Sequence, residues 1–139
     1  MARVLVADDA AFVRKVVSEM LVHGGHEPVG EAGTGADTVE LYRRLRPDVA
    51  IIDVNMPGGD GYSAASEILA HDPAACIVMA SVYPDASLLV EARVPGTVDF
   101  LVKPFELRSL LGAVERACTT VSSGADPPPP RRDASRSSG

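Results

Sequence analysis

The sequence predicts an α/β fold, in which helices cover both faces of a parallel sheet, and two observations lead to this prediction. Five short apolar runs with strand character alternate along the chain with five segments in which apolar residues recur at helical spacing. The first apolar run is uninterrupted, as is typical of a strand that helices cover on both faces. With 139 residues, 46% of them hydrophobic, the chain is long enough for one domain with a single core.

The first half of the chain contains three strands and two helices by these patterns. They are expected in the order strand 3–7, helix 12–21, strand 28–32, helix 36–45 and strand 48–53. Asp8 or Asp9 can cap the first of these helices, and Gly24 with Gly25 can end it. The second helix must stop before Pro47, because a residue that precedes proline is disfavoured in the helical conformation.

The second half opens with a loop and then continues the alternation. The loop 55–61 is dense in proline, glycine and aspartate, which are turn-forming residues. The elements after it are expected in the order helix 64–69, strand 76–81, helix 88–92, strand 98–102 and helix 107–117. We assign residues 1–121 to the folded domain. Residues 122–139 are rich in Pro, Arg and Ser and have almost nothing to bury, so we expect a disordered tail.

Charge and composition exclude several classes of protein. The formal net charge is −6, which argues against nucleic acid as a partner because phosphate contacts need a basic surface. No apolar run approaches the roughly 18 residues that a membrane-spanning helix needs, and Met1-Ala2-Arg3 leads directly into a strand rather than a signal peptide. Cys76 and Cys118 have no disulfide or zinc spacing, so we expect two reduced core cysteines in a cytoplasmic protein.

Polar residues follow four of the apolar runs at the point where each run ends. They are Asp8 and Asp9, Asp53, Ser81 and Lys103. Because the carboxyl ends of parallel strands form one edge of an open sheet, and that edge holds the ligand site, we expect these side chains to lie together. Clustered carboxylates repel each other unless a cation binds them, and ligands that are all oxygen suit Mg²⁺. A lysine beside such a cluster suits an anionic phosphoryl group.

Each of these residues has a plainer interpretation when it is considered alone. An aspartate at a strand end can be a turn residue, and the Asp8-Asp9 pair can cap a helix. Ser81 can be an ordinary strand-end serine, and Lys103 a solvated surface lysine. Their occurrence together, each at the end of a strand, favours the phosphoryl site.

Four segments in order carry a resemblance to a known family. They read Val-Ala-Asp-Asp-Ala-Ala-Phe-Val-Arg (6–14), Ile-Asp-Val-Asn-Met-Pro-Gly-Gly-Asp-Gly (52–61), Val-Met-Ala-Ser (78–81) and Asp-Phe-Leu-Val-Lys-Pro-Phe (99–105). Over Ala2 to Thr120 the chain resembles a response-regulator receiver domain, most of all the short single-domain chemotaxis type of two-component systems. The resemblance implies a flavodoxin-like, doubly wound sheet of five parallel strands in the order 2-1-3-4-5.

The resemblance also assigns roles to the residues at the strand ends. Asp53 is implied to be the phosphoacceptor, which agrees with the ability of a carboxylate to attack phosphorus and hold an acyl phosphate. Asp9 is implied to bind Mg²⁺ directly and Asp8 to bind it through water. Asp53 and the backbone carbonyl of Asn55 complete the implied ligand set, which respects the few carboxylates and several waters that Mg²⁺ takes.

Further roles follow from the resemblance for residues that bind the phosphoryl group or respond to it. Ser81 is implied to hydrogen-bond a phosphoryl oxygen and Lys103 to neutralise its charge. Phe100 is implied to swing inward when Ser81 moves, although simple core packing is an alternative role for this ring.

Three positions are implied to tune the loss or gain of the phosphoryl group. Asn55 and Tyr83 stand where relatives tune hydrolysis: Asn55 orients the attacking water, and the bulky Tyr83 ring shields it. Val82 departs from the alanine or glycine that is usual at its position. We expect this branched side chain to narrow the access to Asp53.

The function implied by the resemblance is a phosphorylation-activated signalling switch, with chemotaxis as one candidate output. A histidine kinase donates the phosphoryl group with Mg²⁺ as the cofactor. A separate output protein binds the face formed by helix 88–92, strand 98–102 and helix 107–117. The switch catalyses only its own phosphorylation and dephosphorylation, so it is not otherwise an enzyme. It is expected to be cytoplasmic, and a monomer or a weak phosphorylation-dependent dimer.

Other functions remain open on the sequence. An aspartate-dependent phosphatase or phosphotransferase usually carries a second aspartate two residues after the nucleophile, where this chain has Asn55, which cannot transfer a proton. A flavin or nucleotide binder needs a glycine- or hydroxyl-rich phosphate loop after the first strand, where the Asp8-Asp9 pair has the wrong charge. A receiver-like adaptor that takes no phosphate and the receiver part of a longer response regulator both fit the sequence.

Overall fold

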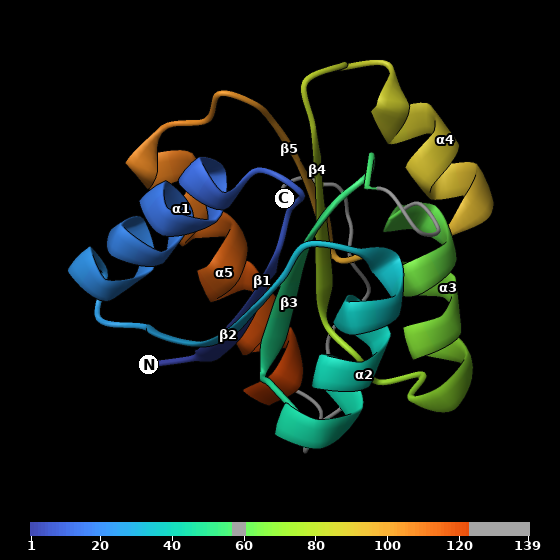
Figure 1. The fold of residues 1–139 in the computed structure, drawn as a ribbon, viewed down its shortest axis with the longest axis horizontal. Helices are drawn as coiled ribbons and strands as arrows, with labels where there is room; N and C mark the ends of the chain where they lie inside the picture. The colour runs from blue at the N-terminus through green and yellow to red at the C-terminus, as the bar shows by residue number, and fades with distance from the viewer. Residues whose placement is uncertain (57–60, 123–139) are drawn as a thin grey trace.

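Five parallel strands form one sheet in the order β2-β1-β3-β4-β5, and helices cover both of its faces (Figure 1). The computed structural model of the chain describes residues 1–56 and 61–122. The elements are β1 (Arg3–Ala7), α1 (Ala11–His23), β2 (Glu27–Ala32), α2 (Gly35–Leu45), β3 (Val49–Asp53), α3 (Gly61–His71), β4 (Ile77–Ser81), α4 (Ala86–Arg93), β5 (Asp99–Val102) and α5 (Leu107–Ser122). The predicted α/β class, doubly wound sheet and strand order are confirmed.

Two predictions concern parts of the chain that lie outside the described residues. Most of the loop predicted at 55–61 is in the range 57–60, and all of the predicted tail except Ser122 is in the range 123–139. The final helix, expected over 107–117, continues to Ser122. Among the described residues, no helix is long and apolar enough to cross a membrane.

The hydrophobic core consists of two layers, one on each face of the sheet. Figure 1 shows α1 and α5 on one side and α2, α3 and α4 on the other. Alternate residues of a strand point to opposite faces, and in β1 Leu5 belongs to the layer under α2, α3 and α4, whereas Val4 and Val6 belong to the layer under α1 and α5. Both cysteines are free, and Cys76 is buried in the core as predicted, whereas Cys118 is half-buried against it. This arrangement places the carboxyl ends of the parallel strands together at one edge of the sheet.

The start of α1 differs from the expectation that Asp8 or Asp9 caps it. Ala10 precedes the helix and provides no side-chain cap. Asp8 instead accepts a hydrogen bond from the N–H of Ala10 at 2.9 Å, one residue too early to cap the first turn. The physical reason is that the Asp8 side chain is buried and paired with Lys103.

The apolar residues that predict α4 are not the ones that attach it to the core. Leu88 and Leu89 are 67% and 52% exposed, whereas Ala86 and Val90 are buried. Val90 packs into the core layer on this face of the sheet. On α1, Phe12 is likewise 75% exposed although it shares helical spacing with Val16 and Met20, which are half-buried. Periodicity therefore identified both helices, but it did not by itself separate their buried apolar residues from the exposed ones.

Candidate functional site

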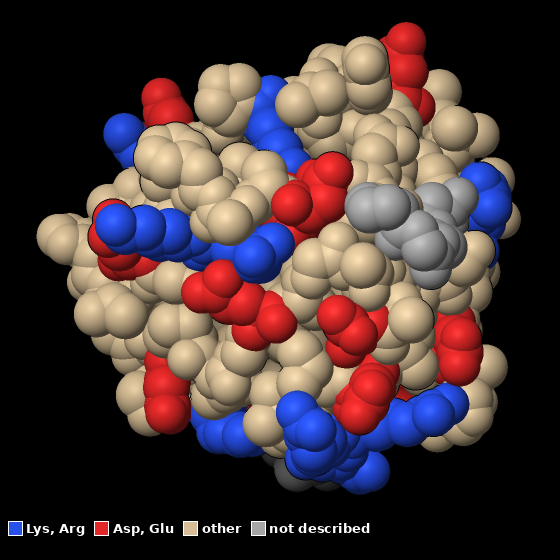
Figure 2. Space-filling model, in the orientation of Figure 1, with Lys and Arg blue, Asp and Glu red and all other residues tan. Residues whose placement is uncertain are grey.

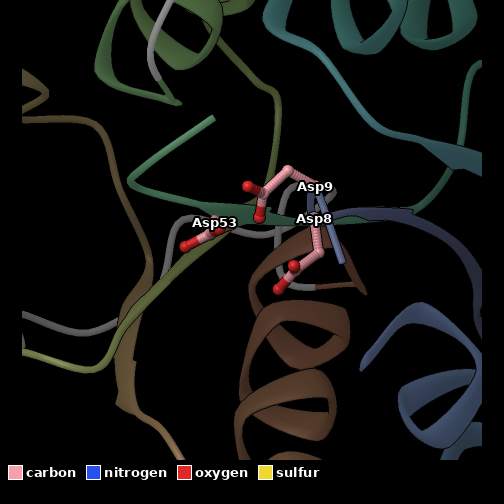
Figure 3. Close-up of side chains that lie close together, drawn as sticks. All are labelled: Asp8, Asp9 and Asp53. Atoms are coloured by element: carbon pink, nitrogen blue, oxygen red, sulfur yellow. The ribbon is translucent and has the colours of Figure 1, made fainter. Parts of the chain in front are cut away.

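Three carboxylates from two neighbouring strands meet at the carboxyl edge of the sheet. Asp8 and Asp9 follow β1 directly, and Asp53 is the last residue of β3, which pairs with β1. One carboxylate oxygen from each lies within 4.8 Å of the others. Figure 3 shows the side chains of the adjacent Asp8 and Asp9 leaving the backbone on different sides. The predicted juxtaposition of acidic residues is present in the structure.

Lys103 reaches this cluster from the loop that follows β5. Its Nζ atom pairs with Oδ2 of Asp8 and lies 3.3 Å from Oδ1 of Asp53. Its backbone N–H donates to the carbonyl of Ser81 at 2.8 Å, which extends the pairing of β5 with β4 past the strand end. The peptide bond to Pro104 is cis. The lysine side chain is 15% exposed, so it is not a solvated surface lysine.

Burial and charge act against each other within the cluster. Asp8 and Asp53 are only 4% and 5% exposed. Burial raises the pKa of the Asp53 carboxyl above its ordinary value of 3.8, although the positive charge of Lys103 opposes the rise. Burial lowers the pKa of Lys103, but the hydrogen bond to Asp8 and the charge of Asp53 outweigh it, so that this pKa is above its ordinary value of 10.5. One ammonium group thus serves two buried carboxylates.

The acidic character of this edge is visible on the surface. Figure 2 shows a group of acidic side chains at the upper centre of the view, where β1 and β3 end in Figure 1. The largest group of Lys and Arg side chains in the view is at its lower edge. The described carboxylates therefore favour a small cation over an unaccompanied anion.

Asp8 and Asp9 differ in how many of their oxygens the protein already uses. Asp8 is buried, and its two oxygens accept from Ala10 N–H and from Lys103. Asp9 is exposed, and its carboxylate makes no hydrogen bond or ion pair within residues 1–56 and 61–122. Asp9 is thus the carboxylate of the pair that is open to an incoming ligand.

Asn55 lies beside Asp53 as the sequence analysis expects. Its backbone N–H is 3.3 Å from Oδ1 of Asp53, so the turn after β3 orients the Asp53 side chain. The Asn55 residue is exposed.

The predicted phosphoryl-binding and switch residues lie on the neighbouring strands. Ser81, the last residue of β4, is fully buried, and its Oγ accepts a hydrogen bond from the N–H of Tyr83 at 3.1 Å. Val82 and Tyr83 are 53% and 64% exposed. Phe100 is half-buried on β5 and packs against the core layer under α4. No described hydrogen bond joins the Ser81 hydroxyl to the carboxylates or to the ammonium group of Lys103.

Two residues shape the cluster although no motif predicts this role for them. A Cβ atom at Gly61 would lie 1.9 Å from the carbonyl oxygen of Asp53, so only glycine fits at the start of α3. Arg14 donates from Nη1 to the carbonyl oxygen of Asp8 at 2.6 Å. The signal for Gly61 was its place in a turn-rich loop directly after a strand. Arg14 is in one of the motifs, but a contact with a backbone carbonyl has no sequence signal.

The fold and the acidic edge with its lysine define the class of signalling receiver domains. Comparison with known proteins agrees, because the model of the response regulator receiver domain family matches residues 4–115. The chain therefore belongs to this family.

Individual relatives include both short and longer proteins. The chain is 38% identical to chemotaxis protein CheY of Thermotoga maritima, over 82% of this chain and 95% of that protein. It is 45% identical to the transcriptional regulatory protein PdtaR of Mycobacterium tuberculosis, over 83% of this chain but only 56% of that protein. A solved structure of the CheX-CheY-BeF3-Mg²⁺ complex from Borrelia burgdorferi matches with a TM-score of 0.75 at 27% identity, over 81% of this chain and 85% of the other.

Proposed function

We propose that this chain is a phosphorylation-activated switch of a two-component system, with Asp53 as the phosphoacceptor. One observation carries the proposal: the buried carboxylate of Asp53 lies 3.3 Å from the ammonium group of Lys103 and within 4.8 Å of the carboxylates of Asp8 and Asp9. A turn aspartate needs neither partner. These neighbours support phosphorylation of Asp53, because Lys103 can compensate the negative charge that a phosphoryl group adds there.

The chemistry at Asp53 is a phosphoryl transfer from a histidine kinase. An oxygen of Asp53 attacks phosphorus, and the bond from phosphorus to the ring nitrogen of the protonated phosphohistidine breaks. The electron pair of that bond leaves with the neutral imidazole, and an acyl phosphate remains. Lys103 balances the added charge. Catalysis extends only to the switch's own phosphorylation and dephosphorylation.

The acidic residues fit a bound Mg²⁺ ion. Asp9 would hold it directly and Asp8 through water, with Asp53 and the Asn55 carbonyl as further oxygen ligands. The open carboxylate of Asp9 and the fully used carboxylate of Asp8 support this division. When bound, the ion supplies positive charge against the phosphoryl oxygens.

Ser81 is suited to detect the phosphoryl group. Its oxygen accepts from Tyr83 N–H, but a hydroxyl also has one proton to donate. Donation to a phosphoryl oxygen would draw Ser81 toward Asp53 and pull on the start of the β4–α4 loop. Phe100, on the next strand, would then adjust its half-buried position. Together these movements bias the protein between two conformations.

The output surface in this proposal is the face of α4, β5 and α5, which binds a separate protein. A groove of about 300 Å³ lies between α4 and β5, and its lining includes Phe100 together with Val90 and Val94 of the α4 end. A change in the Phe100 ring therefore alters the surface that a partner meets. The related CheY of B. burgdorferi is seen in complex with CheX, which supports binding of a separate protein, and the similarity to chemotaxis protein CheY of T. maritima supports chemotaxis as one candidate pathway.

A second candidate function is the receiver part of a longer regulator. It is supported by the similarity to PdtaR, of which this chain matches 56%. In both cases the switch would act in the cytoplasm, where a kinase presents its phosphohistidine. We propose a monomer or a weak phosphorylation-dependent dimer.

The test is the intact mass of the protein after incubation with acetyl phosphate and Mg²⁺. One phosphoryl group should be added to the parent and to Asp85→Asn, an exposed control, and none to Asp53→Asn. Full labelling of Asp53→Asn would overturn the assignment of the site. A parent that takes no label from acetyl phosphate or from any histidine kinase would support the adaptor function instead.

A further inference from the structure

Arg14, on the first turn of α1, joins three parts of the chain next to the acidic cluster. Its Nη1 atom donates to the carbonyl oxygen of Asp8 at 2.6 Å, and its Nε atom donates to Oε1 of Glu31 on β2 at 3.0 Å. The arginine side chain is 19% exposed, whereas Glu31 is 47% exposed. The contact with the backbone is therefore the better shielded of the two.

The carbonyl that Arg14 contacts belongs to the peptide bond between Asp8 and Asp9. A peptide group is planar, so holding its oxygen also fixes the direction in which the chain enters Asp9. On the other side of Asp8, the backbone N–H donates to the carbonyl of Ala32 at 2.9 Å. Both peptide groups that flank the Asp8 Cα are thus held by hydrogen bonds, one from β2 and one from α1.

Asp9 depends on this backbone more than Asp8 does. The Asp8 carboxylate is held by Lys103 and by the N–H of Ala10. The Asp9 carboxylate has no such contact within the described part of the chain. Within the described residues, the main chain that carries it is therefore what restricts its position relative to Asp53.

Gly33 leaves the space that the Arg14 guanidinium group occupies. A Cβ atom at this position would lie 3.3 Å from Nη1 of Arg14 and 4.0 Å from the carbonyl oxygen of Asp8. That separation is tighter than ordinary contact, so a side chain here would press on the guanidinium group. The end of β2 is thus shaped around the same hydrogen bond.

We propose that Arg14 is a positioning residue for the metal-binding carboxylate of Asp9. It acts by holding the Asp8–Asp9 peptide group, and this inference rests on the proposed function of the acidic cluster as a Mg²⁺ site. Two alternative roles for Arg14 predict either the opposite change in Mg²⁺ affinity or an equal effect of removing Glu31. If Arg14 acted only as a nearby positive charge, its removal would tighten Mg²⁺ binding. If it acted through its ion pair, loss of Glu31 would have the same effect as loss of Arg14.

The experiment compares Mg²⁺ dissociation constants of Arg14→Met, Glu31→Gln and Arg43→Met with that of the parent. Arg43 is the matched control because it pairs with Glu67 at 3.3 Å on the exposed surface, away from the cluster. Arg14→Met should weaken Mg²⁺ binding about tenfold, as loss of a residue that orients a metal ligand does. Glu31→Gln should stay within about threefold of the parent, since exposed ion pairs contribute little. Arg43→Met should not differ from the parent.

A second readout uses the metal-free protein. The amide N–H of Asp9 belongs to the same peptide group as the Asp8 carbonyl, so its NMR resonance should move in Arg14→Met and stay in place in Glu31→Gln. Denaturant unfolding identifies variants that have lost the fold. If Arg14→Met does not fold, Arg14→Gln replaces it, because the shorter side chain cannot reach the Asp8 carbonyl, and the same loss is expected.

Three results would overturn the inference. A folded Arg14 variant that binds Mg²⁺ as tightly as the parent, or more tightly, shows that Arg14 does not position the ligand. Equal losses in Arg14→Met and Glu31→Gln assign the effect to the ion pair. If the parent binds no Mg²⁺ at all, both the proposed metal site and the role of Arg14 are wrong. If the parent binds Mg²⁺ and the variant loses no affinity, only the role of Arg14 is wrong.

Discussion

The ammonium group of Lys103 lies 3.3 Å from a carboxylate oxygen of Asp53, although their strands, β5 and β3, are not neighbours in the sheet. The same group pairs with Asp8. Lys103 therefore crosses the end of β4 and balances two buried carboxylates that would otherwise repel each other. The stability of the unphosphorylated site therefore depends on the positive charge of Lys103.

Replacing Lys103 with methionine should destabilise the metal-free fold. It leaves two buried carboxylates without their cation, and breaking a buried pair in this way costs roughly 3–5 kcal/mol. The measurement is the free energy of unfolding in urea at pH 7, with the exposed Lys15→Met as the control. Because the pKa of Lys103 is raised in the fold, its contribution is complete below the ordinary value of 10.5 and is lost as the pH rises through the folded pKa. A loss no larger than that of the control would contradict the prediction.

Replacing Asp53 with asparagine should stabilise the metal-free protein at neutral pH. Burial raises the pKa of Asp53 in the fold, so the folded state holds this proton more tightly than the unfolded chain. Stability therefore falls as the pH rises from the ordinary value of 3.8 through the folded pKa, and the ionised carboxylate is a cost above that window. The gain from Asp53→Asn should shrink as the pH is lowered toward 3.8. Urea unfolding across this range, with Asp85→Asn as the control, checks both signs; a gain that grows on acidification would refute them.

Substitutions of Asp8 and Asp9 should have different effects on the stability of the fold and on the affinity for Mg²⁺. Asp9→Ala should abolish most Mg²⁺ affinity and leave the metal-free fold as stable as the parent or more so, because it removes a like charge that has no described partner. Asp8→Ala should weaken Mg²⁺ binding less. It should destabilise the fold by about 1–3 kcal/mol, since it leaves the N–H of Ala10 without its acceptor and Lys103 with Asp53 as its remaining described partner. Mg²⁺ titration and thermal unfolding of each variant test this assignment. A larger loss of Mg²⁺ affinity in Asp8→Ala than in Asp9→Ala would contradict it.

Gly61→Ala should distort the site by displacing the backbone next to Asp53. The added methyl group would meet the carbonyl oxygen of Asp53 at 1.9 Å, so the backbone of β3 or α3 must shift. We expect a loss of about 2–3 kcal/mol in the free energy of unfolding and slower labelling by acetyl phosphate. Gly112→Ala, inside α5, is the control: its Cβ meets only the flexible end of Arg116 at 3.3 Å, and it should stabilise the helix by up to about 1 kcal/mol. Equal effects of the two changes would show that the approach of Gly61 to Asp53 is unimportant.

Tyr83→Ala and Val82→Ala should change the kinetics of the site without changing the fold. Both side chains are more than half exposed, so their removal should leave unfolding nearly unaffected. If Tyr83 shields the acyl phosphate from water, its removal speeds the decay of labelled protein after the phosphodonor is withdrawn. Val82→Ala should instead speed labelling, because a branched side chain no longer narrows the access to Asp53. Unchanged decay in Tyr83→Ala would mean that steric shielding does not set the lifetime of the phosphoryl group.

Much of the fold and the position of the candidate site follow from local patterns in the sequence. Alternating strand and helix periodicities predicted every element, and the polar residues that end four apolar runs predicted the acidic edge with its lysine. Such predictions succeed because a strand of a parallel sheet must be apolar where helices cover it, and can be polar only where it ends. The residue types at those ends then restrict the chemistry to oxygen ligands and an anion.

Only the tertiary structure shows which member of each pair of similar residues is buried and paired. Asp8 and Asp9 are equivalent in sequence, yet one is buried and paired and the other is open. Leu88 and Val90 are both apolar residues of α4, yet only Val90 is buried. The closeness of Gly61 to Asp53 and the hydrogen bond from Arg14 to the Asp8 carbonyl likewise join segments that no local pattern connects. The physical reason is that periodicity reports the environment of a residue along its own element, whereas these roles depend on distances of a few ångströms between elements, which exist only after the chain has packed.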